Sequence, residues 1–502
     1  MPRLARGLAL ATAALGGLLQ TAPAEGQETT RVSVDSSGAE GNDDSLLPAI
    51  SADGQIVAFG SYASNLVAGD TNGFSDVFVH DRLSGLTERV SVDSSGAEGN
   101  GYSVDPSLSA NGQIVAFHSF ASNLVPGDTN ANVDSFVHDR MTGITERVSV
   151  DSSGAQGNSY SDSPSISADG QIVAFYSYAS NLVAGDTDGH IDIFVHDRST
   201  GITERVSVDS SGTEGNGESY VPSISADGQI VAFYSFATNF GTAGTYGILR
   251  VFVHDRSTGI TEQVSVDSSG AEGNSYSVNS AISADGQLVA FWSYASNLVA
   301  GDANGTPDVF VHDRSIGRTE RVSEDSSGAE GNGSSWYPSI SADGQIVAFE
   351  SNASNLVSGD TNLRADVFVH ERGALDDAAW TNYGSGFPGT YGVPSFTSRA
   401  DPVLGTTITL DLANSSGMYT VGLVLVGAQE VLIPTNKGGD LLVVPVFTTA
   451  IVLAPNGTSI DGDISADPAF SGLEVFMQAI EVDSGAAKGV SFTAGLKLVL
   501  GY

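Results

Sequence analysis

The turn sequence Ser-Ala-(Asp/Asn)-Gly occurs six times in this chain, and each copy follows the previous one by 58 residues. The third residue of the turn is, in order, Asp53, Asn111, Asp169, Asp227, Asp285 and Asp343. Repetition at one fixed spacing is typical of architectures that stack a single supersecondary unit many times. We therefore expect residues 25–373 to form one repeat array rather than several unrelated domains.

Each copy of the repeat contains four segments with the pattern of β-strands. In the copy spanning residues 87–144 these segments are 87–92, 106–109, 113–117 and 135–139. The Asn111-Gly112 dipeptide is a strong hairpin signal. Two of the segments are apolar on both faces, so both sides of each small sheet must be covered. Four short strands covered on both faces predict one blade of a β-propeller.

The two ends of the array favour a closed ring over an open solenoid. Residues 30–35 (TRVSVD) match only the last strand of a copy, and the sixth copy ends near Arg372 without that strand. Together the two fragments make up one blade, whereas an open solenoid would need polar caps at both ends. We predict an all-β fold in which a six-bladed propeller is closed by its N-terminal strand.

The pattern PSISADGQIVAFYS…DIFVHDRSTGITERVS resembles the WD40-like, TolB-type (PD40) propeller repeat of bacterial exported proteins. The resemblance covers residues 29–373 and implies a propeller fold. It implies no single function, because such propellers serve as binding platforms, as enzyme accessories and occasionally as enzymes.

The C-terminal part of the chain does not follow the 58-residue repeat. Residues 374–379 are expected to be a linker, and turn signals at intervals of about ten residues over 380–502 predict an antiparallel β-sandwich. Its expected strands are 406–412, 419–426, 441–447, 473–481 and 495–500. The opening pattern W-x-x-Y-G-x-G-x-P-G and the apolar closing segment resemble a C-terminal module of planctomycete-type exported proteins. This resemblance implies attachment or presentation at the cell surface.

The first 24 residues predict a secretory signal peptide. Arg3 and Arg6 precede the apolar stretch 8–19, and the small residues 22–24 (APA) form a cleavage site. The apolar stretch is too short to span a membrane, and no later segment is long and apolar enough to do so as a helix. We expect a secreted, periplasmic or cell-surface protein.

Charge and cysteine content exclude several function classes. The chain carries 59 Asp and Glu against 20 Lys and Arg, a formal net charge of −39. This charge repels a phosphate backbone at long range and argues against nucleic acid as a partner. The absence of Cys excludes disulfides, Cys-ligated metals and thiol nucleophiles. The expected partner is a protein, a peptide or a glycan.

The positions at which the six copies differ point to a ligand site on the face that carries the long loops. The residue after the shared Val-Ala-Phe changes from copy to copy, and the loop before the first strand carries aromatic residues. Such an aromatic, acid-rimmed surface suits a glycan or a peptide, although aromatic side chains also pack between blades. The candidate ligand-binding residues are His118, Tyr176, Tyr234, Trp292, Trp336 and Glu350.

A histidine followed by an acid and an arginine recurs in every copy. The six histidines are His80, His138, His196, His254, His312 and His370. Six equivalent triplets cannot converge on one point, as a general acid–base site requires. We therefore predict that they serve in packing and turn capping.

A recurring acidic loop, Asp-Thr-Asn-Gly-x-x-Asp in the first copy, is a candidate Ca²⁺ site. Oxygen ligands at alternate positions are what Ca²⁺ loops use, and the spacing resembles shorter versions of the Ca²⁺ loops in integrin-type propellers. Asx turns, in which the same side chains cap backbone N–H groups, are the alternative. The fourth copy, residues 239–250, has lost its acids. The candidate ligands are Asp70, Asn72, Asp76, Asp128, Asn130, Asp134, Asp186, Asp188, Asp192, Asp302, Asn304, Asp308, Asp360, Asn362 and Asp366.

Three functional hypotheses follow. The first is a non-catalytic extracellular binding or scaffold propeller, stabilised by Ca²⁺ and presented by its C-terminal domain. The second is a glycan hydrolase or lyase that uses carboxylates at the channel mouth, with Asp105, Asp162, Glu218 and Glu350 as candidates. The third is a structural surface protein whose acidic loops take up Ca²⁺ between cells. The near-identity of the copies favours the first and third hypotheses over an enzyme.

Overall fold

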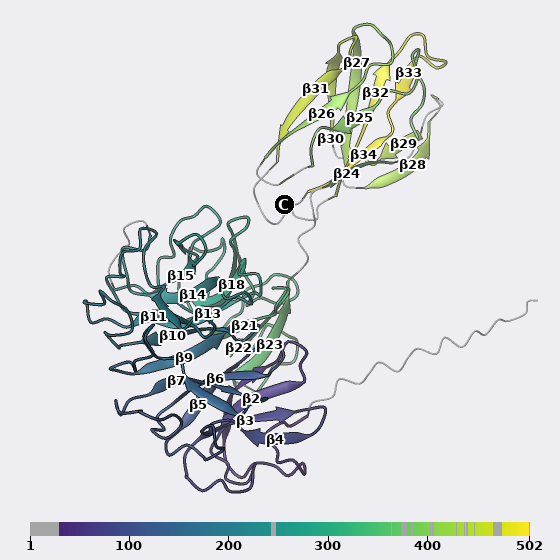
Figure 1. The fold of residues 1–502 in the computed structure, drawn as a ribbon. Coiled ribbons are helices and arrows are strands. Elements are labelled where there is room, and N and C mark those ends of the chain that lie inside the picture. Colours follow the sequence, from purple (N-terminus) through teal and green to yellow (C-terminus); the bar gives the residue numbers. More distant parts are fainter. Residues whose placement is uncertain are drawn as a thin grey trace, which may run out of the picture. The chain divides into compact units, whose positions relative to one another are not determined.

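Small antiparallel β-sheets recur along the first part of the chain at the 58-residue spacing of the repeat (Figure 1). The computed structural model describes residues 30–241, 247–362, 364–372, 379–383, 385–401, 403, 406–427, 429–435, 437, 440–445, 447–464 and 474–500. The predicted signal peptide, residues 1–24, and residues 374–378 of the predicted linker lie outside these ranges. The chain divides into two compact units, Met1–Val264 with Tyr276–Gly286, and Ser265–Ser275 with Gln287–Tyr502.

The first unit contains four antiparallel sheets of four strands, one from each of the first four repeats. Sheet 1 consists of β1 (Ser45–Ile50), β2 (Ile56–Ser61), β3 (Asp76–Asp81) and β4 (Leu86–Arg89). Sheet 2 consists of β5 (Ser103–Leu108), β6 (Ile114–Ser119), β7 (Asp134–Asp139) and β8 (Ile144–Arg147). Sheet 3 consists of β9 (Ser161–Ile166), β10 (Ile172–Ser177), β11 (Asp192–Asp197) and β12 (Ile202–Arg205). Sheet 4 consists of β13 (Ser219–Ile224), β14 (Ile230–Ser235), β15 (Arg250–Asp255) and β16 (Ile260–Gln263), and β17 (Ser277–Ile282) packs against β13 and β14. Each sheet is a simple meander, because strands adjacent in sequence are paired.

The two central strands of each sheet are buried on both faces, as the sequence predicts. In sheet 1, Val57, Ala58 and Phe59 of β2 are all buried, and so are Val77 and Val79 of β3. In sheets 2 and 3, a phenylalanine of the second strand stacks on a phenylalanine of the third strand, with ring centroids 6.0 Å apart. The core is therefore divided into layers between neighbouring sheets.

The turn at Asn111-Gly112 allows sheet 2 to approach sheet 1 closely. Gly112 has a φ of +65°, a left-handed conformation that glycine adopts without steric cost. A Cβ at this position would lie 2.5 Å from the Cβ of Ile56 at the start of β2. Glycine is therefore required here both by the turn and by the contact between the sheets.

The fourth strand of each repeat is shorter than predicted. The segment 87–92 is a strand only as far as Arg89, and Val92 forms an isolated bridge with Glu98. The ladder ends because the backbone N–H of Val77 donates to the side-chain hydroxyl of Ser91 instead of a backbone carbonyl. The N-terminal segment 30–35 likewise has no assigned strand in the described part of the chain, and its Val34 bridges Glu40.

Hydrogen bonds link each sheet to the loop of the preceding repeat. The hydroxyl of Thr145 in β8 lies 2.8 Å from Nδ1 of His138 and donates to the carbonyl oxygen of Val92. The hydroxyl of Ser94 accepts a bond from the backbone N–H of Thr145. Equivalent bonds recur in the neighbouring repeats, and the structural role predicted for the histidines is confirmed in these sheets.

The N-terminal segment occupies the same place on sheet 1 that the preceding loop occupies on sheets 2 to 4. The hydroxyl of Thr87 donates to the carbonyl oxygen of Val34, and the backbone N–H of Thr87 donates to the hydroxyl of Ser36. The segment around Val34 is therefore equivalent to the end of a repeat, as its sequence predicts.

In the second unit, the remaining repeat strands follow the same pattern. They are β18 (Leu288–Ser293), β19 (Asp308–Asp313) and β20 (Arg318–Arg321), followed by a three-stranded sheet of β21 (Ser335–Ile340), β22 (Ile346–Ser351) and β23 (Asp366–Glu371). Strand β23 has no fourth-strand partner among the described residues. Its Val367 and Val369 are 77% and 63% exposed, whereas the equivalent valines of β3 are fully buried.

The C-terminal strands form three antiparallel sheets. The largest contains β24 (Ala379–Tyr383), β34 (Gly495–Val499), β32 (Glu474–Val482), β27 (Thr420–Gly427), β30 (Phe447–Leu453) and β33 (Val490–Phe492). The second contains β25 (Phe396–Ser398), β26 (Thr407–Leu412) and β31 (Thr458–Asp463), and the third contains β28 (Glu430–Pro434) and β29 (Asp440–Val443). Residues of the two larger sheets share one hydrophobic cluster, which includes Phe396, Leu410, Val424 and Leu496. Within the described ranges there is no helix with the length and apolar character needed to cross a membrane.

Candidate functional site

The two positions at which the repeats differ most face each other across the first and second strands of each sheet. In sheet 3, Asp162 of β9 is opposite Tyr176 of β10. In the last repeat, Trp336 is opposite Glu350 in the same register. A β-bulge follows this pair in each of these sheets, and the bulged residue next along the strand has a positive φ. The residues with this conformation are Leu47, Asp105, Ser163, Val221, Asn279 and Tyr337.

At the junction of sheets 2 and 3, these variable positions carry three titratable side chains. Asp105 lies on β5, His118 on β6 and Asp162 on β9, and their ligand atoms all lie within 4.8 Å of one another. Nδ1 of His118 is 2.6 Å from Oδ1 of Asp162. His118 is buried, whereas the two aspartates are half-buried. The three side chains are named the Asp105–His118–Asp162 cluster.

The two carboxyl groups of this cluster have pKa values shifted in opposite directions. Burial raises the pKa of Asp105, and the lowering effect of His118 does not outweigh it. Burial also acts to raise the pKa of Asp162, but the close contact with His118, the charge of that ring and the hydrogen bond from the backbone N–H of Ser163 hold it below its ordinary value. The cluster therefore combines one carboxyl that favours the neutral form with one that favours the anion.

Aromatic rings extend from the cluster across sheets 2 to 4. Tyr102 contacts the His118 ring edge-on, with centroids 6.5 Å apart. The rings of Tyr160, Tyr176, Tyr220 and Tyr234 then follow in succession at centroid distances of 6.5, 5.9 and 5.6 Å. Burial, together with the charge of Asp162, raises the pKa of Tyr176, so this hydroxyl stays protonated.

Two stacked aromatic pairs lie next to the strands that carry the cluster. Tyr102 stacks on Phe120 at 5.8 Å with an interplanar angle of 7°, and Tyr160 stacks on Tyr178 at 5.9 Å with the same angle. Tyr102, Phe120 and Tyr178 are each more than one third exposed. Rings held parallel in this way are preorganised to stack on a planar or apolar ligand face.

The predicted ligand-binding residues thus fall into two groups. His118, Tyr176 and Tyr234 lie in the first unit with the three carboxylates named as enzyme candidates in that unit, Asp105, Asp162 and Glu218. Trp292, Trp336 and Glu350 belong to the second unit, where Trp336 and Glu350 are cross-strand neighbours and the Trp292 ring contacts Tyr294 at 5.7 Å.

In the first three predicted Ca²⁺ loops, an arginine lies among the carboxylates. Nη1 of Arg89 is 3.5 Å from Asp70, 3.2 Å from Asp76 and 2.9 Å from Glu98. The side chain of Asn72 accepts a bond from the N–H of Phe74 and donates to Asp76, which is the geometry of an Asx turn. This loop geometry is the one expected from the turn alternative.

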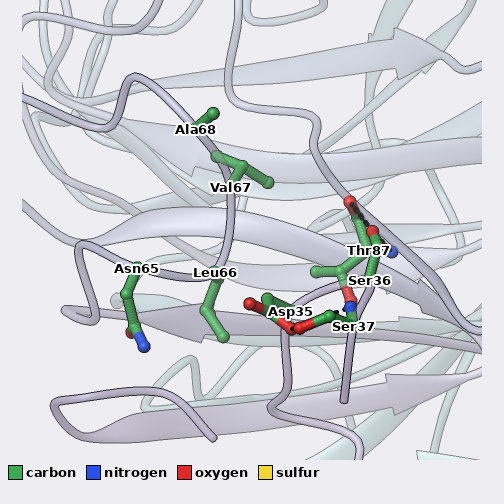
Figure 2. Close-up of a pocket in the computed structure, with 8 residues that line it drawn as sticks. All are labelled: Asp35, Ser36, Ser37, Asn65, Leu66, Val67, Ala68 and Thr87. Carbon is green, nitrogen blue, oxygen red and sulfur yellow. Dashed lines mark hydrogen bonds between the residues drawn. The ribbon is translucent and has the colours of Figure 1, made fainter. Parts of the chain in front are cut away.

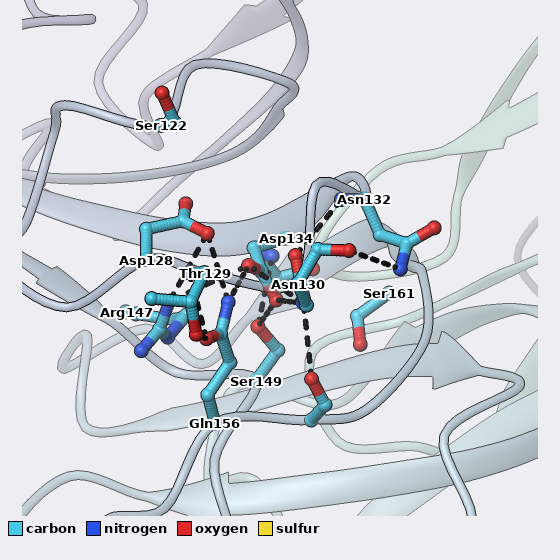
Figure 3. Close-up of polar contacts among 12 residues, drawn as sticks. Ser122, Asp128, Thr129, Asn130, Asn132, Asp134, Arg147, Ser149, Gln156 and Ser161 are labelled. Carbon is cyan, nitrogen blue, oxygen red and sulfur yellow. Dashed lines mark hydrogen bonds and ion pairs between the residues drawn. The ribbon is translucent and has the colours of Figure 1, made fainter.

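The second copy of the loop has the same arrangement, except that Gln156 takes the place of Glu98 (Figure 3). Nη1 of Arg147 lies 3.7 Å from Asp128 and 3.5 Å from Asp134, and Nε2 of Gln156 donates to both aspartates. In the third copy, Asp186, Asp188, Asp192 and Glu214 gather within 4.8 Å of one another beside Arg205. Burial raises the pKa of Asp192 to about 7.

The arginine and the distant glutamate of this network were missed by sequence reasoning. Both recur with the 58-residue period, the arginine at Arg89 and the glutamate at Glu98 in one copy. In the fourth copy the arginine is on the third strand instead of the fourth. Arg250 occupies the position of Asp76, and Gln263 occupies the position of Arg89.

A surface pocket of about 440 Å³ lies beside the N-terminal segment (Figure 2). It is lined by Asp35, Ser36, Ser37, Asn65, Leu66, Val67, Ala68 and Thr87. Nearly all of these residues recur 58 residues later, as at Asp93 and Asn123. The pocket is therefore a feature of the repeat and carries none of the variable residues.

No family model matches the chain, and no curated protein matches it. Among solved structures, a protein described as TolB from Agrobacterium tumefaciens is 15% identical, with a TM-score of 0.37, and the match covers 66% of this chain and 91% of that one. A xyloglucanase from Xanthomonas campestris is 9% identical with a TM-score of 0.35, over 73% of this chain and 50% of that one. An ulvan lyase is 9% identical with a TM-score of 0.30, over 74% and 92%. Likenesses this weak assign no activity to the chain.

Proposed function

We propose that the chain is an extracellular, non-catalytic binding protein whose ligand is a glycan. The observation that carries this proposal is the concentration of sequence differences at one place in otherwise near-identical repeats. His118 of sheet 2 and Tyr176 of sheet 3 hold the same repeat position, and Val104 of sheet 2 stands where Asp162 stands in sheet 3, while the strands keep the same register. Residues that vary on a constant scaffold are typical of a recognition surface.

The stacked aromatic pairs favour a glycan over a peptide as the ligand. Tyr102 and Phe120 flank the first two strands of sheet 2, which carry Asp105 and His118. Tyr160 and Tyr178 flank the first two strands of sheet 3, the first of which carries Asp162. A sugar ring offers an apolar face for stacking and hydroxyl groups for carboxylate acceptors. A peptide would be held by the same rings but would gain less from closely spaced acceptors.

A glycan and peptide array probed with the mature chain tests this proposal. We expect selective glycan binding that falls at least tenfold in the Tyr160→Ala and Tyr178→Ala variants. The Tyr391→Ala variant, which removes an exposed ring of the C-terminal part, is the matched control. Binding that is selective for peptides, or that is unchanged by loss of the stacked pair, would contradict a glycan platform.

We further propose that the repeats form six blades closed into a ring by the N-terminal strand. The C-terminal part is proposed to be a β-sandwich that attaches the protein to the cell surface. Ring closure is supported by the exposed valines of β23 and by the absence of a fourth strand beside it in the described chain. It is also supported by the segment around Val34, which bonds to Thr87 as the end of a repeat does. Export by the predicted signal peptide is tested by locating the mature chain in cell fractions.

Ca²⁺ bound at the acidic loops remains part of the proposal. The third copy supports it best, because its four clustered carboxylates face a single arginine, Arg205. If Ca²⁺ binds there, millimolar Ca²⁺ should raise the melting temperature according to RT ln(1 + [L]/Kd). The Asp188→Asn variant should lose that increase, and a parent protein with no increase would contradict Ca²⁺ binding.

A glycan hydrolase or lyase is the second candidate function. One observation favours it: Asp105 and Asp162 gather around His118 within 4.8 Å, and their pKa values are shifted in opposite directions. Such a pair can supply a general acid and a base. Turnover of a polysaccharide that is abolished in Asp105→Asn would establish the enzyme, whereas binding without turnover supports the platform.

A further inference from the structure

The Asp105–His118–Asp162 cluster differs from the same place at the neighbouring junctions of the first unit. At the junction of sheets 1 and 2 the equivalent residues are Leu47, Gly60 and Val104, and at the junction of sheets 3 and 4 they are Ser163, Tyr176 and Tyr220. The flanking strand residues are unchanged, such as the Val-Ala-Phe before each second-strand position. Three residues of metal-ligating types, two aspartates and a histidine, thus occur together at only this one of the compared junctions.

In the imidazole of this cluster, Nδ1 lies against a carboxylate without the geometry of a hydrogen bond, in spite of its burial. His118 is only 8% exposed, and its Nδ1 has no hydrogen-bond partner of suitable geometry. Oδ1 of Asp162 nevertheless lies 2.6 Å from that nitrogen. A buried imidazole nitrogen that faces carboxylate oxygens without a hydrogen bond is costly. An ion bound between this nitrogen and the carboxylate oxygens would give the nitrogen a partner.

We propose that Asp105, His118 and Asp162 bind one divalent transition-metal ion, with Zn²⁺ as the probe that reports it. One imidazole nitrogen with two carboxylate oxygens is a donor set for Zn²⁺ and related ions. Ca²⁺ prefers oxygen ligands alone, so this site is distinct in chemistry from the acidic loops. Three protein ligands leave a coordination position for water or for an oxygen of a bound molecule.

The site goes beyond the proposed glycan binding, because metal binding can be measured without any glycan. The two proposals can therefore be refuted separately. Binding of Zn²⁺ without binding of any glycan would support the metal site and contradict the proposed glycan binding. Binding of a glycan without binding of Zn²⁺ would contradict only the metal site.

Isothermal titration of the metal-stripped mature chain with Zn²⁺ tests the site, and Co²⁺ provides a visible spectrum that reports an imidazole ligand. The substitutions use residues that the same scaffold already carries at equivalent positions: His118→Tyr as in Tyr176, Asp162→Val as in Val104, and Asp105→Ser as in Ser163. We expect one Zn²⁺ per chain. Each substitution should weaken binding by more than the roughly 10–100-fold that loss of an outer-shell partner costs.

His190→Gln is the matched control. Nδ1 of His190 lies 3.0 Å from Oδ2 of Asp188, so this variant also removes an imidazole beside a carboxylate, but away from the cluster. Zn²⁺ affinity and the Co²⁺ spectrum should be unchanged in His190→Gln. The site is refuted if the parent binds no stoichiometric Zn²⁺, or if the control weakens binding as much as the cluster variants. Circular dichroism melting of each variant checks that it is folded, and any one folded cluster variant is enough to decide.

Discussion

The hydroxyl of Thr145 donates a hydrogen bond to the backbone carbonyl of Val92, which lies 53 residues earlier in the chain. The same hydroxyl faces the ring nitrogen of His138. A single side chain therefore connects a fourth strand, a third strand and the loop of the preceding repeat. Because this connection recurs from sheet to sheet, neighbouring repeats are linked by equivalent polar contacts in addition to their apolar layers.

Replacing Thr145 with valine should destabilise the protein by about 1–3 kcal/mol, because the buried carbonyl of Val92 and Nδ1 of His138 lose their common partner. Valine keeps the shape of threonine, so little packing is lost. Urea unfolding of the parent and the variant measures the difference. Thr142→Val, in the exposed turn before the same strand, should have almost no effect, and equal destabilisation by both variants would contradict the linking role.

Removing residues 30–35 should lower the melting temperature of the repeat array. These residues include Val34, whose carbonyl accepts the bond from Thr87. In the proposed ring they also supply the missing fourth strand beside β23, which would cover Val367 and Val369. Removal of residues 25–29 alone is the control. Melting of the longer deletion at the parent temperature would show that the segment neither closes nor supports the array.

Replacing Arg89 with methionine should destabilise the protein by about 3–5 kcal/mol, because Asp76 is fully buried and would lose its ion-pair partner. Denaturant unfolding at neutral pH measures this loss. The loss should shrink at acid pH, where the remaining carboxylates bind protons. In contrast, Arg82→Met removes an arginine with no ion pair among the described contacts and should cost far less. A similar loss of stability in both variants would contradict the prediction that Arg89 stabilises the surrounding carboxylates.

Asp192 should make stability fall as the pH rises toward neutrality. Burial raises its pKa to about 7, against 3.8 for an ordinary aspartate, so the folded state binds a proton that the unfolded state releases. Its contribution to stability is therefore complete below about pH 4 and is lost as the pH rises through 7. Denaturant unfolding from pH 4 to 8 should show this decline in the parent and a flatter profile in Asp192→Asn. Asp43→Asn, at an exposed position, is the control. If it made the pH dependence of stability equally flat, the decline could not be attributed to Asp192.

The repeated sheets could be predicted from sequence because each repeat carries its own local signals. The Asn111-Gly112 turn and the doubly apolar second strand mark a hairpin in a covered sheet, and both are present in the structure. The length of the fourth strand could not be predicted, because its end depends on the bond between Val77 of β3 and Ser91, which is 14 residues away and lies beyond the last residue of β4.

The candidate site could be predicted only as separate residues. His118 was identified by its variation, and Asp105 and Asp162 as acids that break the repeat, but nothing in the sequence groups them. Asp105 and Asp162 are 57 residues apart, and they meet because the first strands of two sheets lie next to each other. The arginines in the acidic loops were missed for a similar reason, since Arg89 reaches Asp76 only across the β3–β4 pairing.

The positive φ shared by six equivalent residues of the repeats has an evolutionary consequence. The conformation is held at leucine, aspartate, serine, valine, asparagine and tyrosine alike, so it is imposed by the surrounding strand and not by the side chain. The position can therefore mutate freely while the backbone stays in place. A chain that gains or exchanges repeats by duplication would receive a new recognition position each time, already oriented, with no further change to the sheets that support it.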